Sequence, residues 1–224
     1  MSTTLEHDTV EPVAPGRGLR VSLIAIIALA VLVLAGTAGW LVRGGGSSGL
    51  PSMSTSSVDA GFARDMSTHH TQAVTMAGYE RDNTADSKLK ILAYDIETSQ
   101  QFQVGEMQGW LDAWNLPRNS TNPMAWMGDS HMSMGANALM PGMATPDQMN
   151  KLESLHGKAL DVLFLQLMIH HHQGGLPMAK YALAHAKTQY VRDLAQAMIN
   201  AQSSEIIAME QMLRALGGQP LPAP

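Results

Sequence analysis

The sequence predicts an all-α protein in which two repeated helical hairpins form a four-helix bundle, preceded by one N-terminal transmembrane helix. Residues 59–111 and 161–213 align without a gap at an offset of 102 residues, with 13 identical pairs over 53 positions. Apolar residues recur at helical spacing in both repeats. A long ungapped repeat indicates one supersecondary unit used twice, and two helical hairpins bury their apolar stripes against each other as a bundle.

The N-terminal segment contains an uncharged run of 22 residues, Val21–Val42, which is long enough to cross the ~30 Å hydrocarbon layer as a helix. Arg17 and Arg20 precede this run, so the positive-inside rule places residues 1–20, a predicted disordered tail, in the cytoplasm. We therefore expect a single-pass anchor in the cytoplasmic membrane over residues 21–43, with the C-terminal domain outside.

A second interpretation of this segment is a secretory signal. Gly36-Thr37-Ala38 resembles a signal cleavage site, and cleavage there would release a secreted protein. In either case the Gly/Ser-rich residues 44–57 form a flexible linker to the bundle, which we place at residues 58–217.

Composition limits the possible partners of the exported part. The chain has no cysteine, so its core is held without disulfides. The formal net charge is −5, and residues 1–43 carry equal numbers of acidic and basic groups, so all of this charge lies in the exported part. A mildly acidic surface argues against nucleic acid as a partner.

The helix boundaries follow from capping residues and breakers. Ser57 and the Thr145-Pro146 pair read as helix starts, while Pro117 and Gly217-Gly218 read as stops. Pro177 is expected to kink the helix that contains it. The predicted helices are 58–80, 84–114, 145–155, 158–186 and 188–216, with a Met-rich crossover over residues 118–149 between the hairpins.

One face of the first helix combines apolar side chains with two histidines. At 100° per residue, this face holds Phe62, Met66, His69, His70, Ala73, Met76, Ala77 and Glu80. Arg64, Asp65, Ser67 and Thr68 fall on other sides of the helix. The small residues Ala73 and Ala77 leave room for an ion or for a crossing helix.

The repeat retains a cluster of soft donor side chains. Its members are Met66, His69, His70 and Met76, copied as Met168, His171, His172 and Met178. Thioether and imidazole donors together suit copper, above all Cu(I). The alternative is that the methionines fill the core and the histidines are hydrogen-bonded buried groups.

A second group of possible ligands lies in the crossover, where seven methionines and His131 fall within 26 residues among Gly, Pro, Ser and Asp. The candidate ligands are Met124, Met127, His131, Met132, Met134, Met140 and Met143. A flexible loop of this kind could fold around a metal ion. The alternative is a loop that packs its methionines over the end of the bundle.

A carboxylate di-iron centre is not predicted. It needs a Glu-x-x-His motif on two helices, and the one match, Glu153 to His156, lies before the helix-breaking Gly157.

Met140-Pro141-Gly142-Met143-Ala144 and the run Phe164–Gly175, followed by Met178-Ala179, resemble the signature of domain-of-unknown-function family 305. The resemblance covers residues 58–216 and implies a ferritin-like four-helix bundle with a role in periplasmic copper binding and copper tolerance. It also implies a metal-associated role for His69, His70, Met76, His171, His172 and Met178. Gly175 departs from the family pattern, which has alanine there.

Together these observations predict an extracytoplasmic, membrane-tethered protein that sequesters, stores or transfers copper, as Cu(I) or as Cu(II), without catalysis. Its candidate partners are a copper exporter, a copper carrier or a cuproenzyme. Two alternatives stay open: a metal-dependent redox enzyme on the same bundle, and a protein-interaction module that binds no metal.

Overall fold

The computed structural model describes residues 52–128 and 139–224. This part of the chain is helical and contains no strand. Its elements are α2 (Val58–Asn83), α3 (Ser87–Ala113), the short 3-10 helix η1 (Ala125–Met127), α4 (Pro146–Ser154), α5 (Gly157–His185) and α6 (Gln189–Ala215).

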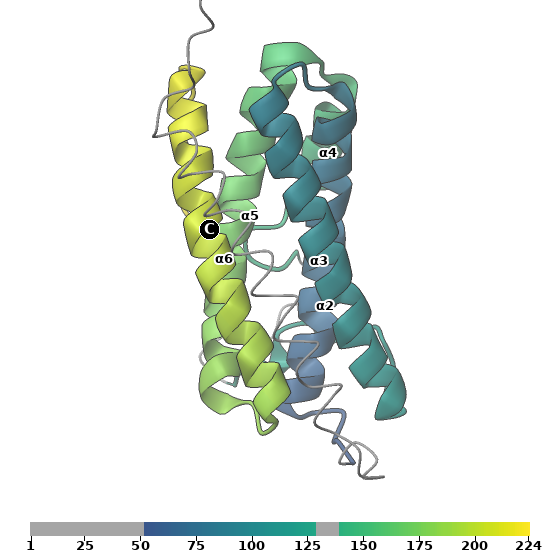
Figure 1. Ribbon diagram of the computed structural model, residues 1–224. Coiled ribbons are helices and arrows are strands. Elements are labelled where there is room, and N and C mark those ends of the chain that lie inside the picture. The colour runs from purple at the N-terminus through teal and green to yellow at the C-terminus, as the bar shows by residue number, and fades with distance from the viewer. Residues whose placement is uncertain (1–51, 129–138) are drawn as a thin grey trace, which may run out of the picture. The chain divides into compact units, whose positions relative to one another are not determined.

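The long helices form two hairpins that meet through their first members. Helix α2 packs along α3, α5 packs along α6, and α2 contacts α5, so α3 and α6 lie on the outer sides (Figure 1). The predicted all-helical bundle of two hairpins is therefore confirmed. Its finer classification as ferritin-like stays a prediction.

Local signals set most helix ends where the sequence predicted them. The Ser57 hydroxyl accepts a hydrogen bond from Ala60 N at 3.1 Å and so caps α2. Thr145 and Gln148 form a capping box at the start of α4. Gly217, with φ +78°, follows the end of α6.

One helix start was predicted wrongly. Helix α3 begins at Ser87 instead of residue 84, because Asp86 is its cap and accepts hydrogen bonds from Lys88 N and Leu89 N. Thr84 instead ends α2, and its hydroxyl donates to Asp161 on α5 at 2.8 Å. The side chain of Thr84 is thus bonded to another helix, and α3 does not begin at this residue.

The aspartates that begin the repeats join the two hairpins. Asp59 on α2 accepts hydrogen bonds from Lys187 N, Thr188 N and the Thr188 hydroxyl at 2.7–2.9 Å, and so holds the two residues that lead into α6. Asp161, its copy on α5, accepts from Thr84 in the turn between α2 and α3. Each hairpin therefore depends on a carboxylate from the other.

Helix α2 is buried on more sides than its predicted face. All eight residues of that face are buried, but Arg64, Asp65 and Ser67 are buried as well. The cause is η1, because the Asp65 carboxylate accepts hydrogen bonds from Met124 N at 2.6 Å and from Trp126 Nε1 at 2.8 Å. The indole of Trp126 fills the position that a Cβ on Gly61 would occupy.

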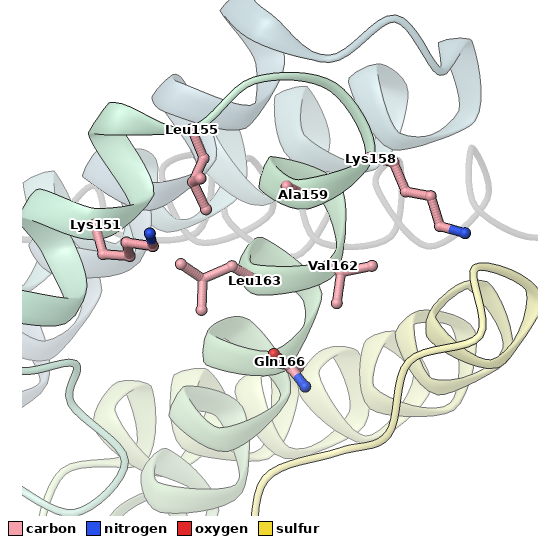
Figure 2. Close-up of a pocket in the computed structure, with 7 residues that line it drawn as sticks. All are labelled: Lys151, Leu155, Lys158, Ala159, Val162, Leu163 and Gln166. Carbon is pink, nitrogen blue, oxygen red and sulfur yellow. The ribbon is translucent and has the colours of Figure 1, made fainter.

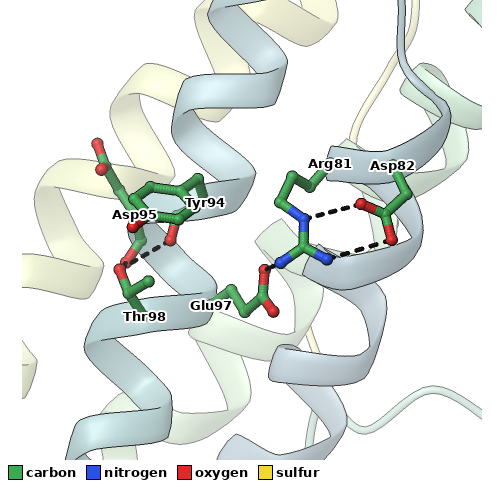
Figure 3. A network of polar contacts seen from close by, with 6 residues as sticks. All are labelled: Arg81, Asp82, Tyr94, Asp95, Glu97 and Thr98. Carbon is green, nitrogen blue, oxygen red and sulfur yellow. Dashed lines mark hydrogen bonds and ion pairs between the residues drawn. The ribbon is translucent and has the colours of Figure 1, made fainter.

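An exposed ion-pair network joins the hairpin of α2 and α3. Arg81 on α2 pairs with Glu97 on α3 and with its neighbour Asp82, as Figure 3 shows. In the same view the Thr98 hydroxyl donates to Tyr94 O within α3. Water screens ion pairs at such exposed positions, so they add little stability and the hairpin is held mainly by its buried face.

The expected kink at Pro177 is not tested, although α5 continues through this residue to His185 and the proline ring is exposed. Within residues 52–128 and 139–224, no helix combines the length and apolar character needed to cross a membrane. The predicted tail, anchor and most of the linker, residues 1–51, lie outside the described residues.

Candidate metal centre

The four predicted histidines meet at the centre of the bundle. His70 and His69 on α2 and His171 and His172 on α5 form a group of imidazoles in which each ring neighbours the next, here called the histidine row. Centroids of neighbouring rings are 6.3, 3.8 and 6.4 Å apart, and the shortest separation joins His69 to His171 across the two helices. All four side chains are fully buried.

Each histidine of the row uses Nε2 in a hydrogen bond to an oxygen. His69 Nε2 lies 3.1 Å from Pro141 O, and His171 Nε2 lies 3.0 Å from His69 O. His70 Nε2 contacts the Gln103 amide oxygen at 2.8 Å, and His172 Nε2 contacts the Glu205 carboxylate at 2.7 Å. Since these oxygens accept, Nε2 carries the proton in every ring.

The opposite nitrogen of every ring is therefore a bare lone pair. Nδ1 of each histidine in the row is buried and has no hydrogen-bond partner among the described residues. Leaving a buried acceptor unsatisfied costs about 1–3 kcal/mol, and here four such atoms lie together. A hydrogen bond on one ring nitrogen that leaves the other as an acceptor is the arrangement of metal-bound histidine.

Burial keeps these rings neutral. It lowers the pKa of His69 to about 4, and it lowers the pKa of His70 to about 3 with a further contribution from the charge of His69. Burial followed by the charges of the other histidines holds the pKa of His171 well below its usual range. These three imidazoles are ready to bind a cation at neutral pH without first losing a proton.

The row belongs to a buried polar layer between two apolar clusters. Below and above it along the bundle, Met66 and Met178 pack in one cluster, whereas Met76 and Met168 pack in the other. All four methionines are fully buried. Two of the predicted methionine ligands thus belong to each of the two buried apolar clusters.

The outer helices complete the polar layer with residues that the sequence analysis did not assign to the site. They are Gln100 and Gln103 on α3, and Gln202 and Glu205 on α6. Gln100 and Gln202 are 3% exposed, and their amide oxygens have no partner among the described residues. The internal repeat could have identified this pair. Gln103 follows His70 by 33 residues, and Glu205 follows His172 by the same number.

Gly175 leaves space beside the row. A Cβ at this position would lie 3.2 Å from His69 Cε1 and 3.1 Å from the Gln202 amide oxygen. The glycine that replaces the family's alanine therefore opens the region next to His69 Nδ1, which would be 3.6 Å from that Cβ.

The crossover segment Met140–Ala144, here called the Pro141 loop, lies against the row. The Gln72 side chain holds Ala144 through two hydrogen bonds, from its Nε2 to Ala144 O at 2.9 Å and from Ala144 N to its Oε1 at 2.7 Å. Gly142 and Gly174 touch so closely that a Cβ on either would overlap the other segment. This contact brings Pro141 O to His69.

Several methionines of the crossover have a packing role. Met124, Met127 and Met140 are at most 5% exposed in the first apolar cluster, and Met143 packs against it. These four methionines therefore pack against the bundle, as the alternative to metal binding by the loop expected. His131, Met132 and Met134 lie outside the described residues.

The acidic and imidazole side chains alone do not make a chelating site. In the described ranges, no three His, Asp or Glu side chains are grouped to hold one ion. An ion in this layer would therefore need thioether ligands beside paired imidazoles, and that mixture favours a soft metal. The residues fit copper better than zinc or iron.

A shallow groove lies away from the row, on α4 and the start of α5. Leu155, Val162 and Leu163 form its floor, and Lys151 and Lys158 stand at its edges (Figure 2). None of the predicted ligands lines it, so it has no part in the metal centre.

Comparison with known proteins supports the helical fold and the family. Two solved structures are similar: a Streptomyces coelicolor DUF305 protein described as secreted (45% identity, TM-score 0.70, covering 75% of this chain and 99% of that one) and a Deinococcus radiodurans DUF305 fragment (30%, 0.59, 70% and 96%). A third is CopM in its Cu(II)-bound form (25%, 0.53, 71% and 97%).

No curated protein matches the sequence. The model of the family described as domain of unknown function DUF305 matches residues 59–213, which is most of the chain. The match begins at the first aspartate of one repeat and ends at the last leucine of the other. This chain therefore belongs to the DUF305 family.

Proposed function

We propose that this protein binds copper in the histidine row and its flanking methionines, and that it sequesters, stores or transfers the metal outside the cytoplasmic membrane. The observation that carries the proposal is the set of four buried Nδ1 lone pairs, each fixed by a hydrogen bond on Nε2. A folded protein gains little by burying these acceptors unless something binds them.

Cu(I) is the favoured ion. Met66, Met76, Met168 and Met178 supply soft thioether donors, the chain has no competing thiolate, and the imidazoles are neutral intermediate donors. Cu(II) is the second oxidation state that these imidazoles suit, and CopM, a structural relative at 25% identity, is known in a Cu(II)-bound form.

The proposed location outside the cytoplasmic membrane is supported by the sequence and by one similar protein. The uncharged run Val21–Val42 would anchor the protein with its bundle outside, and the similar Streptomyces coelicolor protein is described as secreted. A copper exporter, carrier or cuproenzyme is the partner that a tethered copper-binding bundle would serve. His131, Met132 and Met134 of the crossover would form a second, weaker binding segment.

Competition for Cu(I) between the full-length chain and a coloured Cu(I) chelator tests the proposal. The wild type should withdraw Cu(I) from the chelator, and a His69→Leu/His171→Leu variant should lose most of this capacity. His185→Leu is the control, because His185 is exposed and lies outside the row. A wild type that leaves the chelator fully loaded contradicts the proposal.

The same preparation separates the alternatives. Oxygen consumption or peroxide turnover by the copper-loaded chain would favour a metal-dependent redox enzyme. If the chain takes up neither Cu(I) nor Cu(II), the alternative of a protein-interaction module that binds no metal is favoured.

A further inference from the structure

The two terminal histidines of the row have hydrogen-bond partners at matched positions of the repeat, but only one of these partners is charged. At the α3 end, His70 donates to the amide of Gln103, whereas at the α6 end His172 donates to the carboxylate of Glu205. Gln103 and Glu205 occupy matched positions of the repeat, and the two hydrogen bonds have nearly equal lengths, 2.8 and 2.7 Å. The two hydrogen-bond partners therefore differ by one negative charge.

This charge is not balanced by a basic side chain. Among residues 52–128 and 139–224, the ion pair of Glu205 is with His172, and the paired arginines, Arg81, Arg118 and Arg214, pair elsewhere. Asp95 on α3 adds to the negative field, since the Glu205 charge is close enough to raise its pKa alongside the effect of burial. His172 is thus the terminal ring of the row whose direct hydrogen-bond partner carries a negative charge.

A carboxylate behind a ligating histidine strengthens the ligand and attracts the cation. Because the rings lie in a buried layer, water screens this attraction less than it would at the surface. The Glu205 carboxylate is 21% exposed, so it avoids the full cost of burying a charge while His172 in front of it is fully buried. The carboxylate therefore acts on the ion through His172.

We propose that Glu205 is a positioning residue that makes the His172 end of the row the tighter and first-occupied position for a cation. This inference rests on the proposed copper-binding function and adds an order of filling to it. The amide of Gln103 leaves the His70 end weaker, so an ion arriving at the row settles next to α6.

Two isosteric exchanges separate charge from shape. Glu205→Gln keeps an oxygen acceptor for His172 and removes the charge, while Gln103→Glu adds a charge at the matched position. Affinity for the first Ag(I) ion, a diamagnetic substitute for Cu(I), should fall about 10- to 100-fold in Glu205→Gln. Glu210→Gln, on the outer part of α6, is the control and should change affinity less than about twofold.

The order of filling is read by imidazole ¹⁵N NMR of the full-length chain with less than one equivalent of Ag(I). In the wild type, His172 Nδ1 should shift before His70 Nδ1, and in the double exchange Glu205→Gln/Gln103→Glu this order should reverse. Spectra without metal should show the Nε2–H form of His172 in both wild type and Glu205→Gln, which checks that the fold and hydrogen bond persist.

The outcomes distinguish this inference from the proposed function. If Glu205→Gln binds the first ion as tightly as the wild type and in the same order, the role of Glu205 is wrong and copper binding stands. If Ag(I) shifts no Nδ1 resonance of the row in any variant, the copper-binding proposal falls, and the order of filling falls with it.

Discussion

Three histidines of the row, His69, His70 and His171, donate from Nε2 and keep Nδ1 for a ligand, and burial keeps them neutral. Burial lowers the pKa of His69 to about 4 and that of His70 to about 3, and it holds the pKa of His171 well below its usual range. Between pH 7 and pH 5 no proton has to leave these three rings before an ion binds. We predict that the Cu(I) affinity of a His172→Leu variant of the full-length chain, which keeps these three rings, changes less than about threefold over this range.

Chelator competition at pH 7, 6 and 5 measures this affinity. A histidine with an ordinary pKa of about 6.5 would lose roughly 30-fold in affinity by pH 5. A loss of that size would show that the rings titrate as exposed groups do and would contradict the buried geometry.

Glu80 is a second residue whose protonation is set by its surroundings. It is fully buried on α2, and burial followed by the charge of Asp161 raises its pKa to about 8. Because this folded value lies above the unfolded one, the stability that the proton provides is full below about pH 4.5 and is lost as pH rises through about 8.

Glu80→Gln removes this titration, so the variant should gain stability relative to the wild type as pH rises from 5 to 8. We expect a relative gain of at most about 1 kcal/mol per pH unit, measured by urea unfolding at several pH values. Glu153→Gln, at an exposed position, should show a pH-independent difference. A constant difference for Glu80→Gln as well would mean that Glu80 is ionised in the folded chain.

At the scale of elements, the contact between α5 and the Pro141 loop depends on the absence of a side chain at Gly174. A Cβ there would overlap the backbone of Pro141, whereas a Cβ at Gly105 on α3 would meet nothing within 4 Å. Gly174→Ala should destabilise the chain by about 2 kcal/mol or more and weaken copper binding, because the loop that holds His69 must move.

Gly105→Ala is the matched control and should stabilise α3 by about 0.5–1 kcal/mol through helix propensity. Thermal unfolding with and without copper measures both effects. Equal behaviour of the two variants would show that the loop adjusts without disturbing the row.

The carboxylate of Asp59 on α2 holds the two residues that precede α6. It accepts three hydrogen bonds from Lys187 and Thr188, whereas its copy Asp161 accepts one from Thr84. We predict that Asp59→Ala costs about 3 kcal/mol of unfolding free energy and that Asp161→Ala costs less. Urea unfolding of both variants tests the order, and a larger loss for Asp161→Ala would contradict it.

Elements of this kind show how far local sequence determines structure. The ends of α2, α4 and α6 were predictable, because Ser57, Thr145 and Gly217 act on their own helix. The start of α3 was not, because Thr84 bonds to another helix. The burial of Arg64 and Asp65 was missed for the same reason, since η1 covers them from a distant part of the chain.

At the scale of the whole molecule, the two hairpins depend on each other. The His171–His69 bond, the Asp59 bonds and the Asp161 bond all cross between them. We therefore predict that separate fragments 52–128 and 139–224 show no cooperative unfolding alone, and that mixing them restores helicity, measured by circular dichroism. A fragment that melts cooperatively by itself would show that one hairpin is a sufficient folding unit.

The metal centre was predictable from the sequence in part. The repeat identified all four histidines and the four flanking methionines, because helical spacing already places each set on one face. The partners of Nε2 are Pro141, Gln103, Glu205 and the His69 carbonyl, and they come from other elements. Which nitrogen each ring presents is decided by that packing, so it emerges only in three dimensions.

The indole of Trp126 lies in the same apolar cluster as Met66 and Met178 and is fixed there by Asp65. Its ring meets Phe62 and Tyr181 edge-on, with centroids 6.0 and 5.7 Å away. The protein thus contains a fluorophore inside its own interior, close to the thioethers that an ion would touch. Trp110 and Trp114 share this cluster, so tryptophan emission from its interior can follow the arrival of metal without any attached dye.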